Sequence, residues 1–195
     1  MKTEQQSRDR WVWYGGRPSI DFVNTMRDRY AGGRELLRHP QDLADWFAAA
    51  GLIPCRGDFD VELLDEARQL REAIDSGVRA VVGGTHFPRS AQQVINRWLA
   101  NAADHPPRLD VHEGVPVLET TGAPTDARGA LYRIALDAAE LLGGDTRGRV
   151  RICGGVNCSA RFVDLSAGGR RRWCQMAVCG NRAKAAQHRR ATASN

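Results

Sequence analysis

Four of the five cysteines in this 195-residue chain lie in one short window, and their spacing is typical of a metal site. The window holds two matched pairs, Cys153-x4-Cys158 and Cys174-x4-Cys179, with fifteen residues between them. Zinc prefers four soft ligands in a tetrahedron, and each short pair turns two sulfur atoms toward one point. Because four thiolates leave no open position for water, the pattern predicts a structural zinc ion. Cys55 stands alone and is expected to be a small apolar residue.

The residues between and after the two pairs predict a small β-hairpin followed by a helix. Residues 160–164 are expected to form one strand, 166–169 the turn and 171–173 the return strand. The sequence GNRAKAAQHRRATA after Cys179 is rich in helix formers, which places this cysteine at a helix N-terminus. This order is the treble-clef arrangement. The module has little apolar core, so metal binding, worth on the order of 10 kcal/mol or more, would supply its stability.

Basic residues concentrate in the same part of the chain. From Arg147 to Arg190 there are eleven Arg and Lys against one acid, Asp164, a net charge of +10. The remaining residues hold 17 basic and 22 acidic side chains, a net charge of −5. A basic region beside an acidic body favours an anionic partner, whereas an arginine-rich solubilising tail is the alternative.

We expect the basic residues to follow the phosphate backbone of duplex DNA. The residues predicted to contact nucleic acid are Arg170, Arg171, Arg172, Asn181, Arg182, Lys184, Arg189 and Arg190. As structural alternatives, Asn181 would bond back to the knuckle formed by the first cysteine pair and Arg182 would pair with Asp164. Trp173 is expected to pack in the core rather than stack on a base of single-stranded nucleic acid. Preference for single strands would indicate RNA instead.

The rest of the chain predicts a mainly α-helical domain with a small β-hairpin. Apolar residues recur at spacings of three and four, with capping residues before them and glycines after them. The expected helices run from Pro40 to Gly51, from Asp58 or Asp60 to Gly83, from a cap at Ser90 through Leu99, and from Thr125 or Asp126 to Leu142. Residues 109–117 alternate around a Glu-Gly turn and predict the hairpin.

Several classes of protein are disfavoured by what the sequence lacks. The first residues contain no apolar stretch suited to a signal peptide, and no window is apolar enough for a membrane span. We therefore expect a cytoplasmic protein without membrane contact. No phosphate loop, Ser-His-Asp order or His/carboxylate metal set is recognisable, so an enzyme is not expected.

The stretch IDFVNTMRDR, from Ile20 to Arg29, mixes apolar and polar residues. If it is helical, Asp21, Asn24, Thr25 and Asp28 line one side. A small-molecule effector pocket formed by Asp21, Asn24, Thr25 and Arg27 is one interpretation. A polar network that caps helices and ties the body together is the other, and we favour it because no pattern names a ligand.

The cysteine window closely resembles the CGNR zinc finger, which is named for the residues that stand here as Cys179-Gly180-Asn181-Arg182. The resemblance includes the FVD strand, the RRRWC segment and the basic helix. IDFVNTMRDR and PQDLADWFAAAGL are similar to the ABATE domain, the helical N-terminal domain of this family. The resemblance implies a bacterial transcription regulator, in some members linked to stress.

These observations together predict two domains, residues 1–147 as an ABATE-like helical unit for sensing or interaction and residues 148–195 as the zinc finger. The expected function is DNA binding in transcriptional regulation, with zinc as a structural ion. The alternative is a ligand-binding or protein-interaction protein in which the zinc module is purely structural. A homodimer would suit a palindromic operator.

Overall fold

Helices make up most of the structure, a computed structural model that describes residues 11–52, 58–100, 108–112, 115–119 and 126–193. They are α2 (Pro18–Val23), α3 (Pro40–Ala49), α4 (Val61–Gly83), α5 (Arg89–Leu99), α6 (Ala127–Gly143) and α7 (Asn181–Ala193). The predicted mainly helical class with small antiparallel hairpins is confirmed. Among the described helices, none combines the length and the apolar character that crossing a membrane requires.

Local capping chemistry explains where the long helices begin. Asp60 accepts a hydrogen bond from the N–H of Leu63 at 2.7 Å at the start of α4, and Asp126 accepts one from Gly129 at 2.7 Å at the start of α6. Both capping residues were among those predicted. The expected cap at Ser90 is wrong, because α5 already begins at Arg89 and its N-cap position, Pro88, has no side chain that can accept a hydrogen bond.

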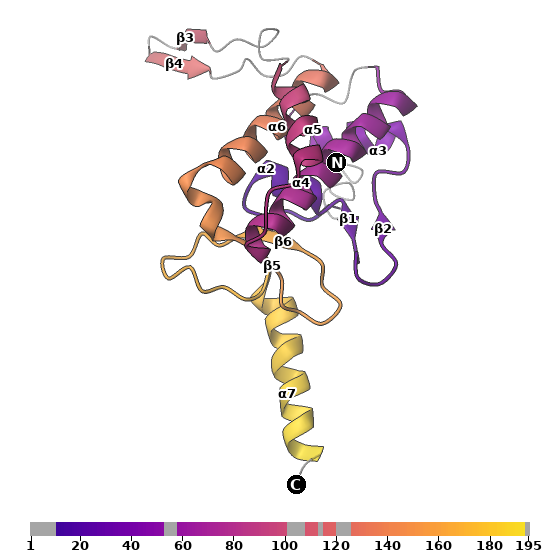
Figure 1. Ribbon diagram of the computed structural model, residues 1–195, viewed down its shortest axis with the longest axis vertical. Helices are drawn as coiled ribbons and strands as arrows, with labels where there is room; N and C mark the ends of the chain where they lie inside the picture. The colour runs from indigo at the N-terminus through magenta and orange to yellow at the C-terminus, as the bar shows by residue number, and fades with distance from the viewer. Residues whose placement is uncertain (1–10, 53–57, 101–107, 113–114, 120–125, 194–195) are drawn as a thin grey trace.

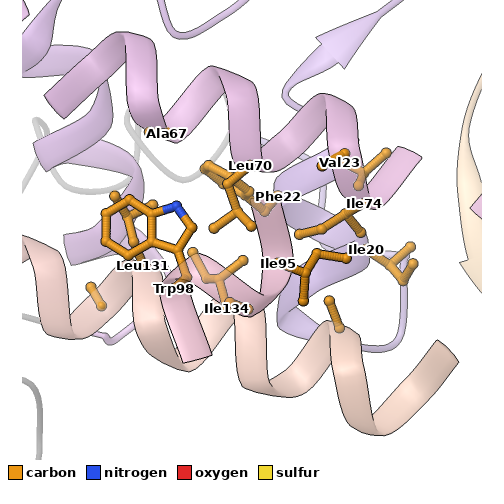
Figure 2. Packing of buried hydrophobic residues seen from close by; sticks show 14 of the residues in the cluster. Ile20, Phe22, Val23, Ala67, Leu70, Ile74, Ile95, Trp98, Leu131 and Ile134 are labelled. Atoms are coloured by element: carbon orange, nitrogen blue, oxygen red, sulfur yellow. The ribbon is translucent and has the colours of Figure 1, made fainter. Parts of the chain in front are cut away.

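The core lies where α2, α5 and α6 pack against α4 (Figure 2). Leu70 and Ile74 of α4 are fully buried, and Ile95 of α5 and Ile134 of α6 point into the same space. Each comes from an apolar stripe with helical spacing, so the burial follows from the sequence pattern. The short helix α2 adds Phe22, which has no exposed surface.

Two small antiparallel hairpins flank the helices. β3 (Arg108–His112) pairs with β4 (Val115–Glu119), which confirms the hairpin predicted there. β1 (Met26–Arg27) pairs with β2 (Arg34–Glu35). Because α2 ends at Val23 and the chain enters β1, the helical side expected for Asp21, Asn24, Thr25 and Asp28 does not form.

A third hairpin joins the cysteine window to the helical body. A 3-10 helix, Asp145–Arg149, leads from α6 into β5 (Val150–Ile152), which pairs with β6 (Arg161–Val163). The strand near residues 160–164 was predicted, but its partner was not: 171–173 is not a strand, and β5, which precedes the first cysteine, takes that place. Val150 and Val163 are buried in the same core as the helices.

α7 leaves the molecule on the side of β5 and β6 and points away from the other helices (Figure 1). Of the described elements, α7 contacts mainly η3 (Met176–Gly180), the turn that directly precedes it. The division of the chain near residue 147 stays a prediction, since β5 and β6 share the core of the body.

Candidate metal centre and basic surface

The four cysteines predicted as metal ligands converge on one point. The sulfur atoms of Cys153, Cys158, Cys174 and Cys179 all lie within 4.8 Å of one another. Sγ of Cys174 is 3.8 Å from Sγ of Cys158 and 3.7 Å from Sγ of Cys179, and all four are free thiols. Zinc–sulfur bonds of about 2.3 Å in a tetrahedron place the sulfur atoms about 3.8 Å apart. The donor set and its spacing therefore fit one zinc ion with a closed coordination shell.

Backbone hydrogen bonds shape the first cysteine pair into a tight turn. Cys153 follows β5 directly and donates from its N–H to the carbonyl of Ala160 at 2.9 Å, while Cys158 donates to the carbonyl of Gly155 at 3.0 Å. A Cβ atom on Gly155 would lie 3.2 Å from Sγ of Cys179. The glycine therefore lets the backbone approach the sulfur cluster closely.

The second pair lies directly before the C-terminal helix. The π-helical turn Met176–Gly180 carries Cys179 into the cluster, and α7 begins at the residue after the turn, Asn181. Cys179 thus lies at the N-terminal end of the helix, as predicted. Nδ2 of Asn181 donates to the carbonyl of Ala177 at 3.1 Å, which lies within the second pair and not in the first-pair knuckle considered for this residue.

Without a cation, the sulfurs of Cys153, Cys174 and Cys179 do not ionise alike. Hydrogen bonds from the thiols of Cys158 and Cys174 lower the pKa of Cys153 to about 2. Burial raises the pKa of Cys179 to about 11, and the neighbouring sulfur of Cys153 raises the pKa of Cys174. A divalent cation supplies the charge that lets all four become thiolates, so metal binding here competes with protons.

Hydrogen bonds to β6 fasten the metal centre to the helical body. The side chain of Asn24 donates from Nδ2 to the carbonyl of Arg161 and accepts at Oδ1 from the N–H of Arg161, both at 2.9 Å. The N–H of Val163 donates to the carbonyl of Gly15 at 2.7 Å. The backbone N–H and C=O groups on the outer edge of β6 thus have hydrogen-bond partners in the helical body. The zinc module by itself would leave these groups unpaired.

Asp21, the first residue of the predicted ligand pocket, is buried and accepts a hydrogen bond from the backbone. Its Oδ1 accepts from the N–H of Gly15 at 2.7 Å. Burial raises the pKa of Asp21 to about 7, with a smaller contribution from the nearby charge of Asp137 and an opposing one from the Gly15 hydrogen bond. Asp21 therefore holds the segment that in turn bonds to β6.

The other predicted pocket residues divide between structure and surface. The hydroxyl of Thr25 donates a hydrogen bond to the carbonyl of Phe22 at 2.7 Å. The side chain of Asn24 is hydrogen-bonded to the backbone of β6. The cavity beside Asn24 and Arg27 has a volume of only about 30 Å³, which suits a water molecule rather than an effector. These contacts support the polar-network interpretation for Asp21, Asn24 and Thr25, whereas Arg27 has no hydrogen bond to that network within the described residues.

The basic residues predicted to bind nucleic acid lie on two neighbouring parts of the zinc module. Arg170 and Arg172 are exposed on the segment that leads to the second cysteine pair. Trp173 is half-buried against the cysteine cluster, with the guanidinium of Arg172 5.2 Å from its ring centroid, so the favoured packing role is confirmed. Four further cations are exposed along α7: Arg182, Lys184, Arg189 and Arg190. Because residues 165–192 contain no acid, this surface is cationic throughout.

Arg171 and Asp164 have structural partners within the module. Arg171 donates from its guanidinium to the carbonyl of Cys174 at 2.7 Å and from its N–H to Oδ2 of Asp164 at 2.7 Å. Asp164 is fully buried, and hydrogen bonds from Ser166, the largest cause, and from Arg171 lower its pKa to about 2. The alternative pairing of Asp164 with Arg182 is not among the contacts of the described residues.

The sequence analysis did not anticipate the buried charges on the long helix α4, which form ion pairs inside the protein. Arg71 is 2% exposed and forms a two-pronged ion pair with Glu35, at 2.6 and 2.7 Å. Asp75 is 4% exposed and pairs with Arg161 of β6. Arg71 and Asp75 follow Ala67 at helical spacing on the apolar stripe, and a charge on such a stripe is the signal that could have found them.

Comparisons with known proteins agree with this architecture. The ABATE family, described as "Putative stress-induced transcription regulator", matches residues 16–145, and the CGNR zinc finger matches residues 149–191. Both descriptions name regulatory or zinc-binding proteins rather than enzymes. A search of curated proteins finds no match to the chain.

Proposed function

Because the chain belongs to the ABATE family and carries a CGNR zinc finger, we propose that it regulates transcription by binding duplex DNA through its zinc module. The bound ion is zinc, and its role is structural, since the four sulfurs fill a tetrahedral shell. The ion holds the two cysteine turns and the start of α7 together. The helical body acts as the sensing or interaction unit.

The observation that carries the proposal is the exposure of α7. Of its residues Asn181 to Arg190, only Ala183 and Ala186 are half-buried, and the rest are exposed. A short polar helix gains little stability in water, because most helical stability in proteins comes from packing an apolar face. A helix of this kind that projects from the body is suited to a polar, anionic groove that covers several of its sides.

The dimensions and charges of α7 fit the major groove. Its 13 residues span about 20 Å, and the major groove admits a helix with its side chains. Arg182 and Arg189 are seven residues apart and share one face. Arg170 and Arg172 extend the cationic surface beyond the first turn of the helix. Neutralising about five phosphates would give a slope of roughly −4 to −5 in log K against log salt.

The test is fluorescence anisotropy of the zinc-loaded protein with labelled duplex DNA of random sequence, titrated with salt. The test variant is Arg182→Gln/Arg189→Gln, which keeps helix propensity and removes two cations. The matched control is Arg89→Gln/Arg97→Gln on α5, which removes two exposed cations from the body. Arg171 is left unchanged, because its contact with Cys174 would confound the result.

We expect the wild type and the α5 control to bind with a steep salt slope, and the α7 variant to bind more weakly with a slope smaller by about two. Tighter binding to single strands would indicate RNA. Weak binding without salt dependence in all three proteins would overturn the proposal and favour the protein-interaction alternative. The homodimer stays a prediction.

A further inference from the structure

A cleft lies between the N-terminal aromatic segment and the zinc module. Its volume is about 580 Å³, within the range of sites for small molecules. One wall is formed by residues 11–14, Trp-Val-Trp-Tyr, and the other by the cysteine turns and the start of α7. The predicted pocket residues other than Arg27 do not line it. It is therefore a different cavity from the one that the sequence suggested.

The aromatic wall is rigid and partly open to the cleft. Trp13 stacks on the buried Trp46 with ring centroids 5.7 Å apart and an interplanar angle of 29°, yet 40% of Trp13 is exposed. Tyr14 packs against the cysteine cluster. A fixed indole with an open side offers a planar surface to another ring, and stacking on it costs little conformational entropy.

Two arginines from different parts of the chain reach the same cleft. Arg27 comes from β1 of the helical body, and Arg182 comes from the first turn of α7. Within the part of the chain that the structure describes, neither guanidinium has an ion pair or a hydrogen bond, to sulfur or to oxygen. By contrast, the buried Arg71 and Arg161 are both paired with carboxylates. The donors of Arg27 and Arg182 are therefore available to a planar acceptor such as a carboxylate.

The charges around the cleft limit the charge of its ligand. A zinc ion with four thiolates carries −2, which the two guanidinium groups balance, and Asp28 is paired with Arg34 at 3.3 Å. A polyphosphate would add several negative charges beside the thiolates. A single carboxylate adds only one, and its two oxygens can bind the guanidinium groups directly.

We propose that this cleft binds a small planar aromatic monocarboxylate, with its ring on the aromatic wall and its carboxylate on Arg27 and Arg182. Arg182 is also one of the residues that we expect to contact DNA, so the ligand would weaken DNA binding by withdrawing that guanidinium. The binding site stands on the cleft alone, whereas this regulatory effect rests on the proposed function.

The binding test uses three probes, benzoate, 1-naphthoate and indole-3-acetate, with 1-naphthamide as the uncharged counterpart. Binding to the zinc-loaded full chain is measured by calorimetry without DNA. We expect at least one acid to bind with a Kd below about 1 mM, and both 1-naphthamide and the Arg27→Gln variant to show about tenfold weaker binding. Arg89→Gln, at an exposed position of α5 outside the lining of the cleft, is the matched control and keeps the affinity; zinc content and circular dichroism verify that each variant is folded.

Absence of saturable binding for all three acids would overturn the proposal, as would equal affinities for 1-naphthoate and 1-naphthamide or an unchanged affinity in folded Arg27→Gln. A second arm repeats the DNA titration with the acid that binds. Weaker DNA binding in wild type but not in Arg27→Gln supports the regulatory effect, and unchanged DNA binding overturns that effect. If the protein binds the acid but no DNA, the proposed function fails while the site stands.

Discussion

Arg161 of the zinc module and Asp75 of α4 form an ion pair inside the protein, with 2.6 Å between Nε and Oδ1 and only 1% and 4% of the two side chains exposed. Asp75 also forms an ion pair with Arg79, with 3.2 Å between Oδ2 and Nε. The guanidinium of Arg161 donates a hydrogen bond to the carbonyl of Ser159. Together with the bonds from Asn24 to the backbone of Arg161, the pair ties β6 to two helices of the body. The zinc module and the body are therefore expected to unfold together.

Removing one partner of this ion pair should strongly lower the free energy of unfolding. In Asp75→Ala, Arg161 stays buried without its carboxylate, and we expect a loss of about 3–5 kcal/mol in the free energy of unfolding. Arg79→Ala, which removes the 59% exposed partner of the same carboxylate, should cost less than about 1 kcal/mol. Urea unfolding of the zinc-loaded proteins measures both. Equal small losses would show that Asp75 and Arg161 are not coupled in solution.

Removing both charges of the ion pair at once should destabilise the protein less than removing one of them. The double variant Arg161→Met/Asp75→Leu leaves no uncompensated buried charge, and we expect it to recover most of the stability lost in Asp75→Ala. The same urea titration gives the comparison. A double variant as unstable as Asp75→Ala would mean that the other contacts of Arg161, rather than its charge, stabilise the interface.

Loss of one cysteine ligand should remove the metal and weaken the whole chain. We expect Cys174→Ser to lose the bound zinc and to show a lower Tm, because the loop between β5 and β6, the strands that share the body core, carries two of the zinc ligands, Cys153 and Cys158. Cys55→Ser is the matched control, since Cys55 lies outside the two Cys-x4-Cys pairs of the sequence, and should keep one zinc per chain. Metal analysis and thermal denaturation report the two quantities. Normal zinc content in Cys174→Ser would contradict the four-sulfur site.

The amide of Asn24 should be hard to replace. Asn24→Leu has a similar volume but leaves the N–H and the carbonyl of Arg161 buried without partners, which costs about 1–3 kcal/mol for each group. Amide hydrogen exchange at Arg161 should accelerate in the variant as the edge of β6 opens. Asn96→Leu, on an exposed position of α5, controls for the substitution itself. Unchanged exchange at Arg161 would count against the pairing.

Asp21 should make stability depend on pH. Its pKa is raised by burial from 3.8 to about 7, so the folded protein holds this proton more tightly than the unfolded chain does. The resulting stabilisation is full below about pH 4 and is lost as pH rises through 7. Relative to wild type, Asp21→Asn should therefore gain stability between pH 5 and pH 8, on the order of 2–4 kcal/mol.

Chemical unfolding of wild type and Asp21→Asn at both pH values, with zinc present, measures this difference and cancels the pH dependence of metal binding. Asp58→Asn, at an exposed position, serves as the control and should follow the wild type. A constant difference between wild type and Asp21→Asn across the range would mean that Asp21 is ionised throughout.

The elements that were predicted correctly are those whose signals are local. Asp60 and Asp126 cap helices because a carboxylate reaches an N–H three residues away, and that relation is visible in the sequence. Ser90 carries a similar side chain, yet α5 begins one residue earlier, at Arg89. A capping residue therefore indicates a helix start to within a residue or two.

The cysteine spacing alone determined the metal site, because tetrahedral coordination restricts where two short pairs can lie and leaves few alternatives. The partner of β6 was decided by tertiary structure, since both β5 and residues 171–173 are near enough in sequence to pair with it. The body selects β5, as Val150 and Val163 then enter the common core and Asn24 pairs with the open edge of β6.

The roles of charged and polar side chains also depended on contacts between distant residues. Arg161 belongs to the basic region by composition, but it pairs with Asp75, 86 positions earlier in the chain, and is removed from the cationic surface. Asn24 reaches the backbone of Arg161 across 137 positions. Such contacts exist because a buried polar group must find a partner wherever the fold offers one. Sequence periodicity and spacing thus determined the helices and the metal ligands, and only the folded chain decided which charges are buried and which remain for a ligand.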